Sequence, residues 1–323
     1  MKKLFSGISV LFLSLVLFLT ASLNVFAAPD GSNQFQSSSS DKKQLLLNKI
    51  DSLPKDSFFE EAKKYLKDGV QPKQLNKSDV EYSNIDIVVY NEENKTFVNL
   101  EKFVDDVQAN NIISTAGYNG VVILNELYSN SGTITHEVTY SAYIGKQADS
   151  LRVNNQLDIS TSRSGSYSTY TSRTDTIKYK QSTKVTSSPR TYFWRGYFGA
   201  DVIESGSVVG YKNGTSTPTL YNNVGAPYPV YTDSHSSHKM SEPPSSNMSV
   251  VPEANRVKWD NYDRGNYISG YISQYGNPSF DWADYDIHHI IPRKYGGTNV
   301  FWNLIPLPRW YHQSVLNTWW NSY

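Results

Sequence analysis

The chain has 323 residues, with 30 basic and 30 acidic side chains and no cysteine. This length is enough for two or more domains. The lack of cysteine excludes disulfides, thiolate chemistry and cysteine-bound zinc, and the balanced charge offers no argument for a nucleic-acid partner.

Residues 1–27 have the pattern of a cleaved secretory signal. Lys2 and Lys3 precede an apolar stretch, residues 8–19, and the segment ends on the small side chain of Ala27. The apolar stretch is shorter than the ~20 residues that a spanning helix needs, so we favour cleavage after Ala27 over a retained membrane anchor. We expect a secreted protein with no stable membrane insertion after cleavage.

The segment 28–41, which contains four consecutive serines, has the composition of a flexible tether. An α+β region is expected to follow over residues 42–110. Apolar residues recur there at helical spacing, Ser57 and Glu60 form the pattern of a capping box, and a further helix is predicted near residues 100–109.

Residues 111–230 are rich in Thr, Ser, Tyr and Val, which predicts an antiparallel β-rich domain, either a sandwich or a barrel. The alternation is clearest from Ile134 to Ile144, where every second residue falls on one largely apolar face. His136 falls on this face, so we interpret it as a hydrogen-bonded core residue rather than a catalytic one.

The β-rich region is mildly basic. Between residues 131 and 220, ten basic side chains stand against six acidic ones, with tyrosines interleaved. Such tyrosines could stack on bases or sugars. A sheet with one solvated face shows the same pattern, and we favour that interpretation.

Residues 231–250 are polar and contain Pro and Ser, which predicts a linker between domains. His235 and His238 lie inside this segment. A flexible linker does not hold ligands in place, so we interpret both as solvated residues rather than as metal ligands.

The last segment, residues 251–323, predicts a β-hairpin capped by a helix. The expected order is a strand over 285–291, a loop over 292–299 that turns on Gly296-Gly297, a returning strand over 300–307 and a helix over 308–321. Adjacent strand residues point to opposite faces, so His288 and His289 are expected to serve different purposes. His312 lies on the helix face that packs on the hairpin. With a strand histidine it offers two imidazole ligands for a divalent metal.

These residues suit phosphodiester hydrolysis, which needs a deprotonated water and a group that takes up negative charge. A histidine that titrates near neutrality serves the first need and a metal the second. Asn303 can fix the tautomer of the base, and Asp286, on the same strand face as His288, is placed to support a metal ligand. Arg293 follows the strand and can reach a phosphate; Arg264, further upstream, is a weaker candidate for such a contact.

The segment 251–323 resembles the HNH, or ββα-metal, nuclease family, and within it the His-His subset of colicin-type DNases and bacterial toxin domains. The matching positions are His288-His289 at the end of the first strand, Gly296-Gly297 in the loop, Asn303-Leu304 at the start of the second strand, and His312 nine residues after Asn303. The expected fold class is therefore multidomain α+β, with a short helical N-terminal region, an antiparallel β-rich middle domain and a C-terminal ββα-metal nuclease domain.

The resemblance implies a role for each matched residue: His289 as the general base, His288 and His312 as metal ligands, and Asn303 as the residue that orients the base. Some members of the family have a third histidine one turn further along the helix. This chain has Leu316 at that position, so solvent or Asn317 would complete the metal site.

We therefore expect a secreted endonuclease that uses a divalent metal (Mg, Mn, Zn or Ni) and acts on nucleic acid, with DNA favoured over RNA. The toxin members of the family also imply an immunity protein as a partner. The alternatives are a surface or cell-wall binding protein whose β-rich domain does the binding, and a zinc-stapled or degenerate module without catalysis. Because residues 251–323 carry six basic and six acidic side chains, either basic residues cluster around Arg293 and Lys294 or the β-rich region supplies the positive charge.

Overall fold

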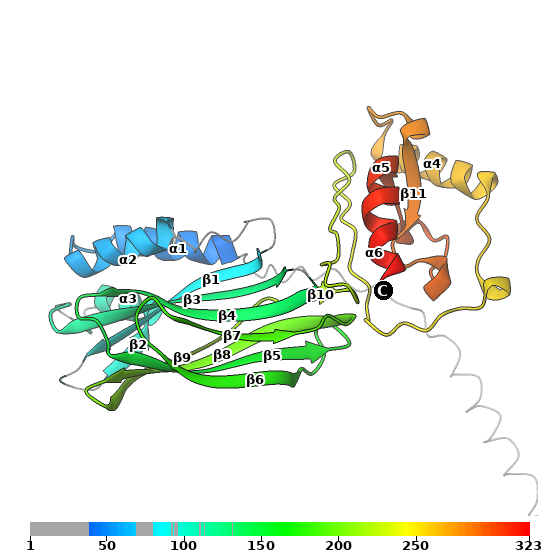
Figure 1. Cartoon of the computed structure of the whole chain (residues 1–323). Helices are drawn as coiled ribbons and strands as arrows, with labels where there is room; N and C mark the ends of the chain where they lie inside the picture. The colour runs from blue at the N-terminus through cyan, green and yellow to red at the C-terminus, as the bar shows by residue number, and fades with distance from the viewer. Residues whose placement is uncertain are drawn as a thin grey trace, which may run out of the picture. The chain divides into compact units, whose positions relative to one another are not determined.

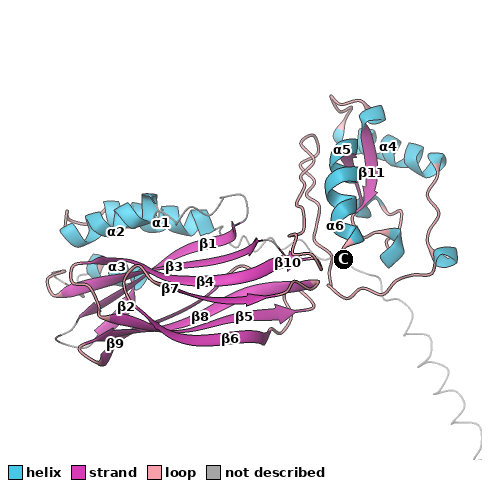
Figure 2. Ribbon diagram, in the orientation of Figure 1, coloured by secondary structure: helices cyan, strands magenta, loops and turns pink. Residues whose placement is uncertain are grey.

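The computed structural model describes residues 39–68, 80–91, 93, 96–109, 111–112, 114–130 and 132–323. The fold is α+β, with antiparallel sheets in the middle of the chain and short helices before and after them (Figures 1 and 2). The chain divides into two compact units, residues 1–45 and 46–323. The predicted signal sequence and almost all of the predicted tether lie outside the described residues. Within the described residues, no helix is long and apolar enough to cross a membrane.

Two five-stranded antiparallel sheets form the middle of the chain. Sheet A has the order β2-β1-β3-β4-β7, with the bounds β1 Val80–Asn91, β2 Thr96–Asn99, β3 Tyr118–Asn130, β4 Thr133–Ile144 and β7 Ser182–Ser187. Sheet B has the order β10-β8-β5-β6 with β9 beside β8, and the bounds β5 Ser150–Ser160, β6 Ser168–Ile177, β8 Tyr192–Glu204, β9 Ser207–Thr215 and β10 Thr219–Tyr221. Val121 and Val138 of sheet A pack against Val153 and Phe198 of sheet B with no exposed surface. The sheets therefore pack face to face as a sandwich rather than closing into a barrel.

Helices α1 (Ser39–Asp51), α2 (Ser57–Asp68) and α3 (Leu100–Gln108) come from the N-terminal region. The buried face of α2, with Phe58 and Phe59, packs with Phe103 of α3 and Val122 of sheet A. This packing gives sheet A a second core on its outer face. The predicted helices are confirmed, but the expected cap is wrong: the Asp56 side chain, not Ser57, accepts the backbone N–H of Phe58 at 2.8 Å.

Strand β4 does not keep a single apolar face. The register with β3 shifts between Val122 and Ile123, which pair with Ala142 and Tyr140, so Ser141 is an extra residue. Tyr140 therefore belongs to the core between the sheets, while Ala142 belongs to the core under the helices. A bulge turns the later side chains to the opposite face, which strict alternation could not predict.

His136 is a core residue, as predicted, with no exposed surface. Its Nδ1 lies 2.6 Å from Asn155 Oδ1, and its Nε2 lies 2.6 Å from the side chain of Asn125. The Asn155 amide nitrogen donates to the backbone oxygens of His136 and Thr183, so its Oδ1 must accept the Nδ1–H. Burial lowers the pKa of the ring to about 4, so the ring is neutral near pH 7 and its Nε2 must accept a hydrogen bond, which the otherwise unpartnered amide nitrogen of Asn125 can supply.

A pH dependence of stability follows from this buried ring. Burial lowers the pKa of His136 from 6.5 to about 4, so between these values the unfolded chain binds more protons than the folded one. Stability is fully present above the unfolded pKa and falls as the pH drops below it. From about pH 7.5 to about pH 5, we expect the wild type to lose roughly 2 kcal/mol more unfolding free energy than His136→Gln. Urea unfolding of both proteins measures this difference, and parallel losses would contradict it.

The C-terminal elements are α4 (Asn261–Tyr275), β11 (Tyr285–His289), β12 (Leu304–Pro308), α5 (Arg309–Tyr311), a π-helical turn (His312–Leu316) and α6 (Asn317–Asn321). Strands β11 and β12 pair antiparallel, with His288 opposite Ile305. The returning strand starts later than predicted because Phe301–Asn303 form a 3-10 turn. The predicted helix is present, but its middle is a π-turn rather than a regular α-helix.

Residues 231–250 differ from the expected linker. Asp233 and Met240 are each 1% exposed, and the Tyr271 hydroxyl of α4 donates to Asp233 Oδ2. His235 donates from Nε2 to the Tyr275 backbone oxygen at 3.0 Å and stacks on Tyr271. His238 is half-buried, with its ring centroid 6.1 Å from that of Trp302. The interpretation of His235 and His238 as solvated is therefore wrong, because aromatic side chains of α4 and Trp302 pack on this polar segment.

Candidate functional site

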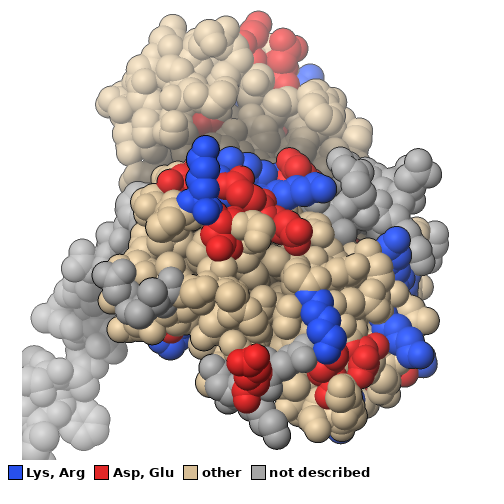
Figure 3. Space-filling view, turned by 90° about the vertical axis from the view of Figure 1, so that its left-hand side faces the viewer, with Lys and Arg blue, Asp and Glu red and all other residues tan. Residues whose placement is uncertain are grey.

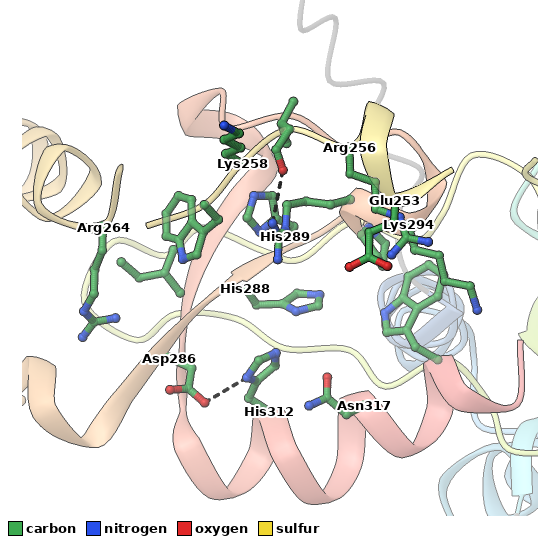
Figure 4. A pocket seen from close by; sticks show the side chains of 16 residues that line it. Glu253, Arg256, Lys258, Arg264, Asp286, His288, His289, Lys294, His312 and Asn317 are labelled. Carbon is green, nitrogen blue, oxygen red and sulfur yellow. Dashed lines mark hydrogen bonds and ion pairs between the residues drawn. The ribbon is translucent and has the colours of Figure 1, made fainter. Parts of the chain in front are cut away.

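A pocket of about 720 Å³ lies in the C-terminal part of the chain (Figure 4). Its walls come from β11, the loop after β11, the helical segment after β12, and α4 with the residues that precede it. Five of the predicted site residues line it: Asp286, His288, His289, Arg293 and His312. Asn303 does not line it. The structure therefore gathers residues that are up to 26 positions apart in the chain.

His289 is held in one orientation by an asparagine that the sequence did not single out. Its Nε2 lies 2.8 Å from Asn299 Oδ1, and Asn299 Nδ2 donates to the Lys258 backbone oxygen at 2.8 Å. Since the amide nitrogen is engaged elsewhere, Oδ1 must accept a proton from His289 Nε2. The neutral ring then carries its lone pair on Nδ1. Burial lowers the pKa of His289, although the hydrogen bond to Asn299 opposes the shift.

Asn303 has a different contact from the predicted one. Its Oδ1 accepts the backbone N–H of Ile291 at 2.8 Å, and its Nδ2 donates to the oxygens of Ile291 and Thr298 at 3.2 and 2.9 Å. The expected contact between Asn303 and the ring of His289 is therefore wrong. Asn303 immediately precedes β12, and its amide bonds to Ile291 just after β11. The side chain therefore links the two ends of the loop. The only sequence signal for Asn299 was its place between the glycine turn and Asn303.

His312 is oriented by Asp286 on the neighbouring strand. Its Nδ1 donates to Asp286 Oδ2 at 2.9 Å, which leaves the lone pair on Nε2. Arg309 Nε and Gln313 Nε2 approach the same carboxylate, each at 3.4 Å. Burial disfavours the charged carboxylate, but the hydrogen bonds that it accepts, first from His312 and then from Arg309 and Gln313, outweigh it, so the pKa of Asp286 is lowered. The carboxylate is charged at neutral pH and fixes the imidazole.

His288 points toward His312 (Figure 4), with 5.0 Å between the ring centroids. Its Nε2 is buried and has no hydrogen-bond partner. Burial, followed by repulsion from His312 and His289, holds the pKa of His288 well below its usual range. A buried nitrogen without a partner is costly unless a ligand fills its coordination.

These two imidazoles fit a divalent metal, with His288 Nε2 and His312 Nε2 as nitrogen ligands. The carboxylate behind His312 matches the usual support of a metal-bound histidine. Within the described part of the chain, no group of three or more His, Asp or Glu side chains could hold a metal ion. Solvent, substrate or another side chain would have to complete the coordination.

The loop between β11 and β12 closes tightly at its glycines. Gly296 adopts a left-handed conformation with φ of 86°. A Cβ at Gly297 would lie 1.6 Å from the backbone oxygen of Ile291, so this position accepts no side chain. This close approach of two backbone segments closes the loop that carries Arg293, which lines the pocket, and Asn299, which contacts His289.

Positive charge gathers at the pocket although residues 251–323 are neutral overall. Of the six basic residues there, five line the pocket: Arg256, Lys258, Arg264, Arg293 and Lys294. Only two of the six acidic residues line it, Glu253 and Asp286. None of the five cations forms an ion pair with a described carboxylate. The lysines are exposed, which leaves them available to an anion.

The arginines at the pocket are partly committed to the protein backbone. Arg293 Nη1 donates to the Val257 oxygen at 3.1 Å, and Arg256 Nε donates to the Val251 oxygen at 3.0 Å. Arg264 Nη2 donates to the oxygens of Trp282 and Tyr285. These bonds fix the direction of each guanidinium. Each arginine has five N–H groups, so donors are left over for an anion.

Basic residues of the β-rich region are mostly neutralised. Seven of the ten form ion pairs with carboxylates, namely Lys146, Arg152, Arg163, Arg173, Lys184, Arg195 and Lys212. Figure 3 shows one face of the molecule, on which Lys and Arg lie beside Asp and Glu. The pocket is therefore a stronger concentration of unpaired positive charge than the sandwich.

The pocket combines three capacities. His289 can accept a proton at Nδ1, His288 and His312 can bind a divalent cation, and the surrounding lysines and arginines can bind an anion. No family model, no curated protein and no solved structure matches the chain.

Proposed function

We propose that residues 251–323 form a metal-dependent endonuclease of the ββα-metal type, which hydrolyses phosphodiester bonds in nucleic acid, with DNA favoured over RNA. The observation that carries the proposal is the placement of an oriented, neutral His289 beside the His288 and His312 pair in a cationic pocket. The signal-like pattern of residues 1–27 adds that the enzyme acts after secretion.

In the proposed reaction, His289 Nδ1 takes a proton from a water molecule, whose oxygen attacks the phosphorus while the P–O bond to the leaving oxygen breaks. Asn299 holds the opposite nitrogen of the ring, so the base keeps its direction as it becomes charged. Asp286 similarly holds His312 with Nε2 free for a metal. When bound, the divalent metal would stabilise negative charge on the phosphate and on the leaving oxygen.

The arrangement of cations favours an extended substrate. In Figure 4, Arg264 lies on one side of the three histidines, and Arg256 and Lys294 lie on the other. Charges on both sides of a scissile phosphate suit neighbouring phosphates of a continuous strand. This supports cleavage inside a polynucleotide over hydrolysis of a terminal phosphate.

The test is cleavage by the purified mature protein, residues 28–323, of supercoiled plasmid, single-stranded DNA and RNA. Each substrate is incubated with Mg²⁺, Mn²⁺, Zn²⁺ or Ni²⁺, and with a chelator. We expect nicked and linear plasmid with at least one metal and none with chelator. Absence of cleavage with every metal and substrate would overturn the proposal. It would favour the alternative, a surface or cell-wall binding protein with an inert C-terminal module.

Charge reversal in the pocket should weaken DNA binding. We expect Lys294→Glu to weaken binding roughly tenfold and to lower the slope of log K against log salt by about 1. Fluorescence anisotropy with a labelled duplex, in chelator so that no cleavage occurs, measures both quantities. The matched control is Lys178→Glu, an exposed lysine of the β-rich region, which should leave binding almost unchanged. A larger effect at Lys178 would show that the β-rich region supplies the charge.

A further inference from the structure

The helical segment from Arg309 to Asn321 contains a π-turn at a position that bears on the metal site. Its hydrogen bond runs from the Asn317 backbone N–H to the His312 oxygen, five residues back. In an α-helix the bond joins residues four apart, and residue i+4 lies above residue i. A π-turn inserts one residue, and such turns are rare and often found at functional sites. Residue 317 therefore takes the place above His312 that residue 316 would have in a regular helix.

The side chains follow this shift. Leu316 has no exposed surface and packs in the core with Ile305 and Trp319. Asn317 lines the pocket, and Figure 4 shows its side chain on the same side as His312. No described residue forms a hydrogen bond with the Asn317 side chain. The π-turn thus keeps an apolar residue in the core and places a polar one over the pocket.

We propose that Asn317 is the third protein ligand of the metal site, through its side-chain oxygen, together with His288 and His312. This inference rests on the proposed metal-dependent function. A second observation supports it independently, because the buried Nε2 of His288 also lacks a partner and lies in the same pocket. His288 from β11, His312 from the π-turn and Asn317 from α6 line the same pocket. Together they offer two imidazole nitrogens and one amide oxygen.

The oxygen has a chemical consequence for the metal. Amide, carboxylate and water oxygens suit Mg²⁺ and Mn²⁺, whereas imidazole nitrogens favour Zn²⁺ and Ni²⁺. A site with two imidazoles and one amide oxygen should accept the harder ions better than a site with three imidazoles. Asn317 is therefore the residue that sets metal selectivity in this chain.

The experiment is a metal titration of the mature protein without nucleic acid, using isothermal calorimetry with Mn²⁺ and with Zn²⁺. We expect Asn317→Ala to weaken Mn²⁺ binding at least about tenfold. Asn317→His should strengthen Zn²⁺ binding relative to Mn²⁺ binding. The matched control is Asn321→Ala, the same substitution at an exposed position of the same helix, which should bind Mn²⁺ as the wild type does. Circular dichroism of each metal-free variant checks that the fold is retained.

The outcomes separate this inference from the proposed function. Equal Mn²⁺ affinity in wild type, Asn317→Ala and Asn321→Ala would overturn the ligand assignment, even if the wild type cleaves DNA. Weak Mn²⁺ binding by Asn317→Ala alone would support the assignment, even if no substrate is cleaved. A wild-type protein that binds neither ion would overturn the ligand assignment, while the cleavage test with all four metals decides the proposed function separately.

Discussion

Plasmid cleavage by the mature protein is expected to fall by roughly 10²- to 10⁴-fold on His289→Ala, the range that a general base contributes. The loss should be confined to chemistry. His289 is bound by one asparagine and contacts Trp259 edge-on, so its removal leaves the histidine pair and the cations in place. DNA affinity in chelator should therefore remain close to that of the wild type, and urea unfolding measures the stability lost on truncating this buried ring.

A second variant shows whether the orientation of His289 matters. Asn299→Ala removes the acceptor of the Nε2–H while leaving the base present, so the rate should fall by less than in His289→Ala. Initial rates of plasmid nicking, measured with a saturating concentration of the most active metal, compare the two. Robust digestion by His289→Ala would sink the assignment of the base, and a full rate in Asn299→Ala would remove Asn299 from the mechanism.

The other large effect is expected from Gly297→Ala. The added Cβ would meet the Ile291 backbone oxygen at 1.6 Å and the Ile291 carbonyl carbon at 2.6 Å. Backbone atoms cannot rotate away as a flexible side chain can, so the loop must open and release the amide of Asn303. We expect destabilisation of more than about 3 kcal/mol, above the usual range for an overpacked site, together with loss of cleavage.

The control for Gly297→Ala is Gly265→Ala in α4. No atom lies within 4 Å of a Cβ at Gly265, and alanine is about 1 kcal/mol more favourable than glycine inside a helix. This variant should be as stable as the wild type or more stable. Urea unfolding followed by tryptophan fluorescence, with cleavage rates, tests both. A Gly297→Ala protein with normal stability and rate would show that the loop is not closed at this residue.

The sequence could predict the elements of the site but not all of its contacts. The helical spacing after Ser57 and the hairpin around Gly296 follow from local rules of periodicity and turn chemistry, and the structure has both elements. The roles of Asn299 and Asn303 depend on which of two amides reaches a ring across a folded loop. That choice is made by tertiary packing, so the resemblance to a family pattern assigned the wrong asparagine to the ring contact.

The π-turn and the bulge at Ser141 share one physical cause of failed prediction. Each inserts a single residue into a regular element, and each thereby redirects every side chain that follows. Periodicity in a sequence assumes that no such insertion occurs. Net charge is a sum without positions, so a value of zero could not show that most of the basic side chains of residues 251–323 line one pocket.

The packing of residues 228–240 against the C-terminal elements changes which stretch of chain can be moved as one structural unit. Tyr228 packs on Trp319 with 4.9 Å between ring centroids, Tyr311 donates to the Val230 oxygen at 3.2 Å, and Tyr271 donates to Asp233. Recombination that joined residues 251–323 to a foreign partner would leave these contacts behind. A fragment that is to keep these contacts therefore has to include the preceding segment from Tyr228 onward.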